Sequence, residues 1–106
     1  MLVVTSETVA NHRIVKTLGL VRGNTVRARH VGKDILAGLR NMVGGEIHEY
    51  AKLIAESREQ SIDRMVAEAL SLGANAIVAT RFTTSVMMGG AAELLAVGTA
   101  VIIESE

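Results

Sequence analysis

The chain has 106 residues, of which 49% are hydrophobic and 21% are charged, and its eleven Lys and Arg balance its eleven Asp and Glu. These values predict a single folded domain over residues 1–106, because a chain of this length buries one core but not two. Zero net charge argues against a general binder of nucleic acids or anionic membranes, since both usually depend on excess Lys and Arg. With no cysteine, the chain can form neither a disulfide nor a thiolate metal site.

Two further patterns bear on compartment and ligand class. The longest apolar run, residues 94–103, is shorter than the roughly 20 residues of a membrane-spanning helix. The first residues lack the basic and then apolar start of a signal peptide, so we expect a cytoplasmic protein with no membrane partner. Only Tyr50 and Phe82 are aromatic, which leaves little material for stacking nucleic-acid bases.

The N-terminal quarter has the composition of strands. Residues 2–5 form a short apolar run that predicts an edge strand, ended by the polar residues Thr5 to Glu7. Residues 14–21 are rich in β-branched and aliphatic side chains, and Gly23-Asn24 is typical of a tight turn. We therefore predict a hairpin in which residues 25–28 return antiparallel to residues 14–21.

Two helices follow in the sequence pattern. Apolar residues at helical spacing over 35–43 predict a short helix, capped by Asp34 and ended by Gly44-Gly45. A second pattern predicts a long helix over residues 46–72, closed by Gly73. At 1.5 Å per residue this helix is about 40 Å long, which exceeds the diameter of a compact domain of this size, so it must overhang or kink.

The apolar stripe of the long helix has one charged member. It comprises Ile47, Ala51, Ile54, Arg58, Ile62, Met65, Ala69 and Leu72. At its centre, Arg58 either lays its stem along apolar surface with its head in water or pairs with a carboxylate.

Residues 75–84 and 93–104 predict a closing pair of antiparallel strands. Alternate residues of the last strand are apolar on both faces. One helix layer covers one face, so the second face predicts a further cover, for which another subunit is the simplest candidate. Gly98 within this strand predicts a bulge or a close backbone approach. The order strands, helices, strands indicates the α+β class.

Several blocks of this sequence carry a resemblance. They are residues 34–45 (DILAGLRNMVGG), Tyr50, Ser57-Arg58, residues 72–78 (LGANAIV) and residues 98–101 (GTAV). In order and spacing they resemble the YbjQ family of small bacterial and archaeal proteins, over nearly the whole chain. The resemblance implies an α+β fold with an antiparallel sheet, one short helix and one long helix, assembled as a homopentameric ring. The family is labelled "putative heavy-metal-binding".

These blocks supply the positions that we expect at subunit interfaces or beside a ligand between subunits. They are Gly44, Gly45, Tyr50, Arg58, Asn75, Gly98 and Thr99. Four of these positions also have a structural interpretation: the glycine pair as a corner between helices, Asn75 as a bond to nearby backbone at a helix end, and Gly98 as a packing position.

The residues offer few ligands for the metal that the family label implies, and the cofactor is left as unknown or a metal ion. His12, His30 and His48 are the only imidazoles, and the family blocks contain none of them. His48 and Glu49 at the start of the long helix, with the thioethers of Met87 and Met88, are the candidate ligands for zinc or copper. The alternative is that Glu46 and Glu49 complement the helix dipole and that the methionines pack beneath the hairpin.

No arrangement of residues suggests catalysis. Ser57, Ser61 and Thr99 could act as nucleophiles, but no spacing places an activating base beside them. We therefore predict a non-enzymatic binding or structural module that associates with copies of itself. A heavy-metal-binding protein is the alternative.

Overall fold

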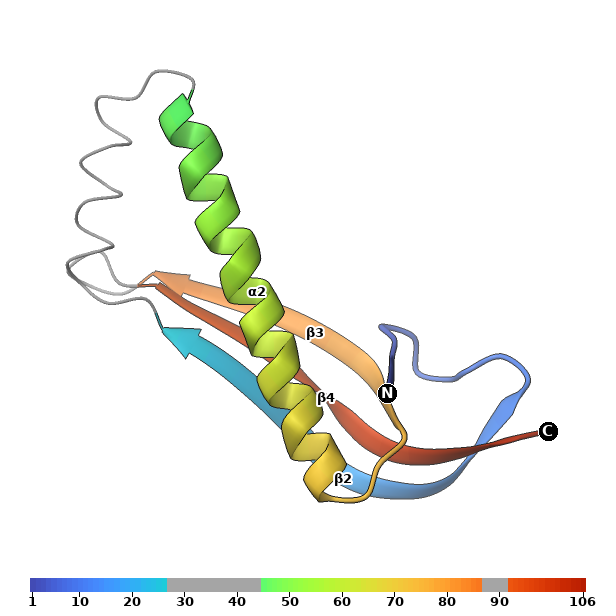
Figure 1. The fold of residues 1–106 in the computed structure, drawn as a ribbon. Coiled ribbons are helices and arrows are strands. Elements are labelled where there is room, and N and C mark those ends of the chain that lie inside the picture. The colour runs from blue at the N-terminus through green and yellow to red at the C-terminus, as the bar shows by residue number, and fades with distance from the viewer. Residues whose placement is uncertain (27–44, 87–91) are drawn as a thin grey trace.

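The computed structural model describes residues 1–26, 45–86 and 92–106, which form a four-stranded sheet and one long helix (Figure 1). The elements are β1 (Leu2–Val3), β2 (His12–Val26), α2 (Gly45–Ser71), β3 (Ala76–Val86) and β4 (Ala92–Ser105). Strands, helix and strands follow one another along the chain, so the predicted α+β class is confirmed. The predicted short helix over 35–43 lies outside the described residues.

The strands lie in the order β1-β3-β4-β2, with β4 hydrogen-bonded on both sides. β4 pairs antiparallel with β2 and with β3, as predicted for the closing pair. β1 pairs parallel with β3, Leu2 opposite Ala76 and Val3 opposite Ile77. The prediction that this segment is an edge strand is confirmed, but the sheet is mixed rather than antiparallel because its first strand runs alongside β3.

The predicted hairpin around Gly23-Asn24 is wrong, because β2 is one continuous strand through both residues. Gly23 pairs with Ala96 and Asn24 with Leu95. A Cβ atom on Gly23 would collide with the carbonyl oxygen of Ser61 and the backbone nitrogen of Met65. Gly23 is therefore needed for close approach of α2 to the sheet, a use of glycine that the sequence does not distinguish from a turn.

The long helix begins at Gly45 and ends at Ser71, close to the predicted bounds. Gly73 adopts a φ of 85°, and its N–H donates to the carbonyl of Leu70 at 3.0 Å. A residue with a side chain is strained in this left-handed conformation, which is why glycine ends the helix there. The predicted role of Gly73 is confirmed.

The buried stripe of α2 differs from the predicted one in its central part. Its fully buried members are Ser57, Ser61, Met65 and Ala69, at steps of four residues. Arg58 is exposed, so it does not occupy the buried stripe. Small hydroxyl residues take the buried positions because the helix approaches β2 too closely at Gly23 for larger side chains.

One core cluster lies between α2 and the sheet. Its buried members are Val21, Met65, Ala69, Ala74, Ile77, Ala96 and Ala100, with Val3, Leu18 and Val66 packed against them. The small residues of β4 allow the helix to lie close to the central strand. Among the described residues, no aromatic side chain belongs to this core beneath the helix.

A second cluster shows what covers part of the opposite face. Ala76, Val78 and Val101 are buried there, and Val4, Val9 and Ile103 pack against them. Val4 and Val9 belong to the segment between β1 and β2, so the chain itself supplies part of the predicted second cover. Further along β4, Leu95, Val97 and Thr99 are only half-buried.

The molecule is elongated. Its principal extents are 55, 24 and 16 Å, and its radius of gyration is 17.0 Å, whereas a compact domain of this length has a radius of about 13 Å. Figure 1 shows the reason: the N-terminal half of α2 projects beyond the sheet. The predicted overhang of the long helix is confirmed.

Candidate binding surface

The structure describes the side chain of none of the four candidate metal ligands. His48 and Glu49 belong to the first turns of α2, whose side chains up to Ala51 the structure does not describe. Met87 and Met88 lie outside the described residues altogether, as does Gly44. Within the described ranges, no group of three or more His, Asp or Glu is placed to hold a metal ion. The metal assignment therefore stays a prediction.

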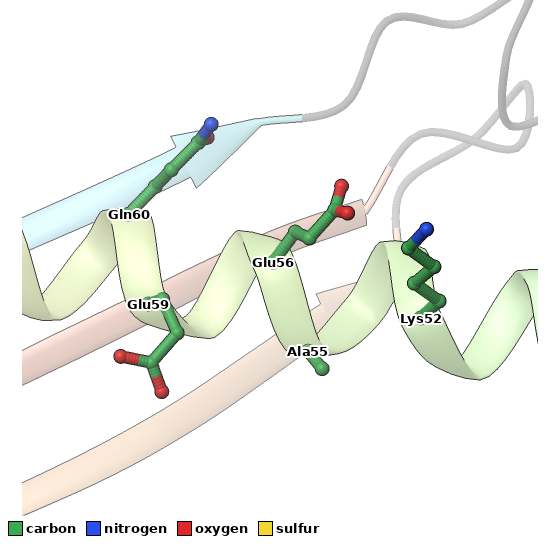
Figure 2. A pocket seen from close by; sticks show the side chains of 5 residues that line it. All are labelled: Lys52, Ala55, Glu56, Glu59 and Gln60. Atoms are coloured by element: carbon green, nitrogen blue, oxygen red, sulfur yellow. The ribbon is translucent and has the colours of Figure 1, made fainter.

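A shallow depression lies along α2 just after that segment (Figure 2). It is lined by Lys52, Ala55, Glu56, Glu59 and Gln60. Figure 2 shows the carboxylates of Glu56 and Glu59 pointing to different sides of the helix, although the two residues are three positions apart. Carboxylates that diverge do not chelate one ion, so this surface of α2 offers no metal centre by itself.

Both polar atoms of the Asn75 side chain form hydrogen bonds within the fold. Its side-chain amide donates to the carbonyl of Ile103 at 2.9 Å, and its side-chain oxygen accepts from the N–H of Ile103 at 2.8 Å. These two bonds make the Asn75 side chain mimic a paired strand residue beside β4. The predicted bond from Asn75 to backbone is confirmed, but it reaches across to β4 rather than to residues nearby in sequence.

Gly98 lies opposite a bulge. Val78 pairs with Thr99 and Arg81 with Val97, so Ala79 and Thr80 both face the single residue Gly98. Ala79 has a φ of 54°. A Cβ atom on Gly98 would lie 2.6 Å from a methyl carbon of Ile77. Of the two predicted alternatives at Gly98, the structure has the bulge, which lies in the neighbouring strand β3, and the closest atom is a side-chain carbon rather than another backbone. Thr99 beside it is half-buried on the opposite face.

Thr80 is the one buried polar side chain in the described part of the chain whose hydroxyl has no hydrogen-bond partner. It is 3% exposed. Its hydroxyl oxygen would lie 3.3 Å from a Cβ atom on Gly98. Burying such a group without a partner costs free energy, so this side chain destabilises the sheet at the bulge.

The two outer edges of the sheet differ. At the β2 edge, the side chain of Arg64 donates to the carbonyl of Asn24, and the N–H of Arg22 donates to the carboxylate of Glu68 at 3.4 Å. Two side chains of α2 thus occupy backbone groups of β2. At the β3 edge, residues 81–85 are all exposed, including Phe82 at 44%.

The comparisons with known proteins agree with this fold. Residues 1–104 match the family described as "Putative heavy-metal-binding", so the chain belongs to the YbjQ family. It is 58% identical over 104 residues to UPF0145 protein DET1617 of Dehalococcoides mccartyi, covering 98% of this chain and 100% of that protein. It is 57% identical over 101 residues to a UPF0145 protein of Archaeoglobus fulgidus, covering 95% and 94% of the two chains.

A solved structure supports the fold independently. A crystal structure of a DUF74-family protein of unknown function from Pediococcus pentosaceus superposes with a TM-score of 0.65 over 98% of both chains, at 15% sequence identity. At this identity the likeness concerns the fold alone. In the described residues, no helix is both long and apolar enough to cross a membrane.

Several features of this surface were missed by reasoning from sequence. The buried serines of α2 and the protection of β2 by Arg64 and Glu68 both depend on contacts between distant segments. Only Phe82 carried a signal, because it is the single phenylalanine of the chain.

Proposed function

We propose that this protein is a non-enzymatic binding or structural module that assembles into a homo-oligomeric ring, with five subunits as in the family resemblance. Its ligand binds between subunits. The interface draws on positions of the sequence blocks, among them Gly44, Gly45, Tyr50, Arg58 and Thr99.

The elongated shape is the observation that carries this proposal. A radius of gyration of 17.0 Å means that the chain leaves much more surface in water than a compact fold of 106 residues. Part of that surface is apolar: Leu20 is 64% exposed, Val26 51% and Phe82 44%. Assembly with further copies would bury such residues.

Heavy-metal binding is the second candidate, favoured by the description of the family. A ring brings one copy of each weak ligand per subunit toward a common axis, so a site can form that no single chain contains. The ligands we propose are His48 and Glu49 for zinc, and Met87 and Met88 for copper(I).

Native mass spectrometry of the untagged protein, before and after addition of zinc and copper(I), tests both candidates. We expect a single oligomer, with a mass of five chains of 11.2 kDa each. A monomer at micromolar concentration would contradict the proposed assembly.

The metal arm of the experiment uses matched variants. If metal binds stoichiometrically, His48→Ala should remove the zinc mass, and replacing both Met87 and Met88 with leucine should remove the copper mass. His12→Ala is the control, because His12 lies in β2 and its ring nitrogen Nδ1 is 2.8 Å from the carbonyl of Ala10. An oligomer that gains no mass from either ion would contradict the metal assignment and leave the assembly standing.

A further inference from the structure

The segment after β1, residues 4–9, is bonded to β3 at the bulge, and we call it the strap. The N–H of Ala79 donates to the carbonyl of Ser6 at 2.8 Å. The N–H of Thr80 donates to the carbonyl of Val4 at 3.1 Å. Successive N–H groups of a regular strand point to opposite sides, so a bulge is needed to present both to one neighbour. The strap and the bulge therefore depend on each other.

Two further contacts fasten the strap. Nη1 of Arg81 donates to the carbonyls of Thr5 and Thr80, both at 2.8 Å. The two valines of the strap pack against the second cluster, on the face opposite α2. Arg81 is on that same face, because it pairs with Val97, whose neighbour Ala96 is buried beneath α2. The bulge sets this orientation, since it fixes which face each residue after it occupies.

The bulge itself costs free energy in two places. Ala79 has a φ of 54°, a left-handed conformation that residues other than glycine rarely adopt. The hydroxyl of Thr80 is buried and has no hydrogen-bond partner among the described residues, which is a second cost. The bonds and contacts of the strap offset these costs, so the bulge is less stable when the strap is away.

A regular β3 has a different register. If the strand continued regularly from Val78, every residue after Ala79 would move by one position against β4 and turn to the other face. The hydroxyl of Thr80 would then leave its buried place. Phe82, which is 44% exposed in the present register, would lie opposite Leu95, which is half-buried. The shift relieves both costs of the bulge and brings the aromatic side chain beside an apolar one.

We propose that the strap and the bulge form a two-state element that sets the register of β3. With the strap in place, β3 is bulged and Phe82 is on the face that α2 covers. With the strap released, β3 is regular and Phe82 is on the opposite face. The same shift carries Arg81 away from the carbonyl of Thr5, so the two parts change together. The element acts within one chain and does not depend on the proposed assembly.

Disulfides between engineered cysteines report the register, because the chain has no native cysteine. Thr83→Cys and Leu95→Cys are opposite in the bulged register, whereas Phe82→Cys and Leu95→Cys are opposite in the regular one. Each pair is oxidised in the full-length protein, and peptide mass spectrometry measures the disulfide formed within one chain. We expect the disulfide between positions 83 and 95 in the parent protein.

The bulge is shifted with a matched pair at one position. Ala79→Val disfavours the left-handed conformation, and Ala79→Gly favours it. We expect Ala79→Val to raise the yield of the disulfide between positions 82 and 95 at least about tenfold, and Ala79→Gly to leave it at the parent value.

The strap is shifted with a second pair. Val9→Asp places a charge in its apolar contact with the second cluster, and Glu7→Gln is the control at an exposed strap position. Because coupling between two sites is reciprocal, Val9→Asp should also raise the yield between positions 82 and 95. For the same reason, Ala79→Val should speed cleavage after Glu7 by a glutamate-specific protease. Persistence of the disulfide between positions 83 and 95 in both variants would overturn the two-state element.

Thr80→Val keeps the test decisive even if those variants unfold. It removes a cost that only the strapped state has, since the Thr80 hydroxyl is buried without a partner there. We expect it to slow cleavage after Glu7, and to reverse the effect of Val9→Asp when the two are combined. Unchanged or faster cleavage in Thr80→Val would show that the bulge and the strap are not coupled.

Discussion

At the scale of single residues, two glycines of this sheet serve close approach rather than turns. Gly23 lies beneath the backbone of α2, and Gly98 lies beneath a side chain of β3. The difference matters, because a helix backbone moves only with its neighbouring turns, whereas Ile77 can respond by a small change of its own χ1 angle.

We predict that Gly23→Ala lowers the free energy of unfolding by about 3 kcal/mol, since the new methyl group would force α2 away from the sheet. Gly98→Ala is the matched comparison and should cost less, about 1.5 kcal/mol, because Cγ2 of the fully buried Ile77 can shift by a small turn about χ1 without moving the backbone. Urea denaturation followed by circular dichroism measures both. Equal costs would contradict the assigned close contact between Gly23 and the helix.

Thr80→Val should raise stability, which is unusual for a substitution in a core. The hydroxyl of Thr80 is buried without a partner among the described residues, and valine replaces it with a methyl group of similar size. We expect a gain of about 1 kcal/mol in the free energy of unfolding. A loss on the same urea titration would show that the hydroxyl makes a bond that stabilises the bulge.

At the scale of elements, one hydroxyl joins α2 to two strands. Ser61 Oγ lies 3.0 Å from the hydroxyl oxygen of Thr25 in β2 and 3.0 Å from the carbonyl oxygen of Leu94 in β4. It also lies 3.0 Å from the carbonyl of Ser57 in its own helix. All of these groups lie in a buried layer, so each needs its partner.

Ser61→Ala should lower the free energy of unfolding by about 2 kcal/mol, because it leaves the Thr25 hydroxyl and the Leu94 carbonyl without this partner. Ser71→Ala is the control. Its hydroxyl donates to the carbonyl of Glu68 in an exposed position, and we expect a change below about 0.5 kcal/mol. Thermal unfolding of both variants checks the difference, and similar melting temperatures would argue against a bonded buried layer.

The elements differ in how far the sequence predicts them. The long helix and its glycine stop follow from local spacing and from the conformation of Gly73, so α2 was predicted nearly to its bounds. β2 was predicted as a hairpin instead of one strand, because a glycine that lies beneath a helix, as Gly23 does, cannot be distinguished in the local sequence from a glycine in a turn. The buried serines were missed for a related reason: the helix period identifies a face, but partners in β2 and β4 decide which residues that face buries.

At the scale of the whole molecule, the length of the predicted helix, compared with the diameter of a compact domain, predicted that α2 overhangs or kinks. The apolar residues on both faces of β4 predicted a cover for its second face. The cover proved to be in part the chain's own segment after β1, through Val4 and Val9. Sequence patterns show that a surface is apolar, but they do not say which segment reaches it. The candidate site shares this limit, because a surface between copies is not encoded by residues adjacent in sequence.

Small-angle X-ray scattering of the untagged protein tests the central claim, that this elongated chain is one subunit of an assembly, most directly. A free chain has a mass of 11.2 kDa and a radius of gyration near 17.0 Å. We predict a forward scattering that corresponds to five chains, with a radius of gyration well above that of a single chain. A scattering mass of one chain with a radius of 17.0 Å would contradict the account.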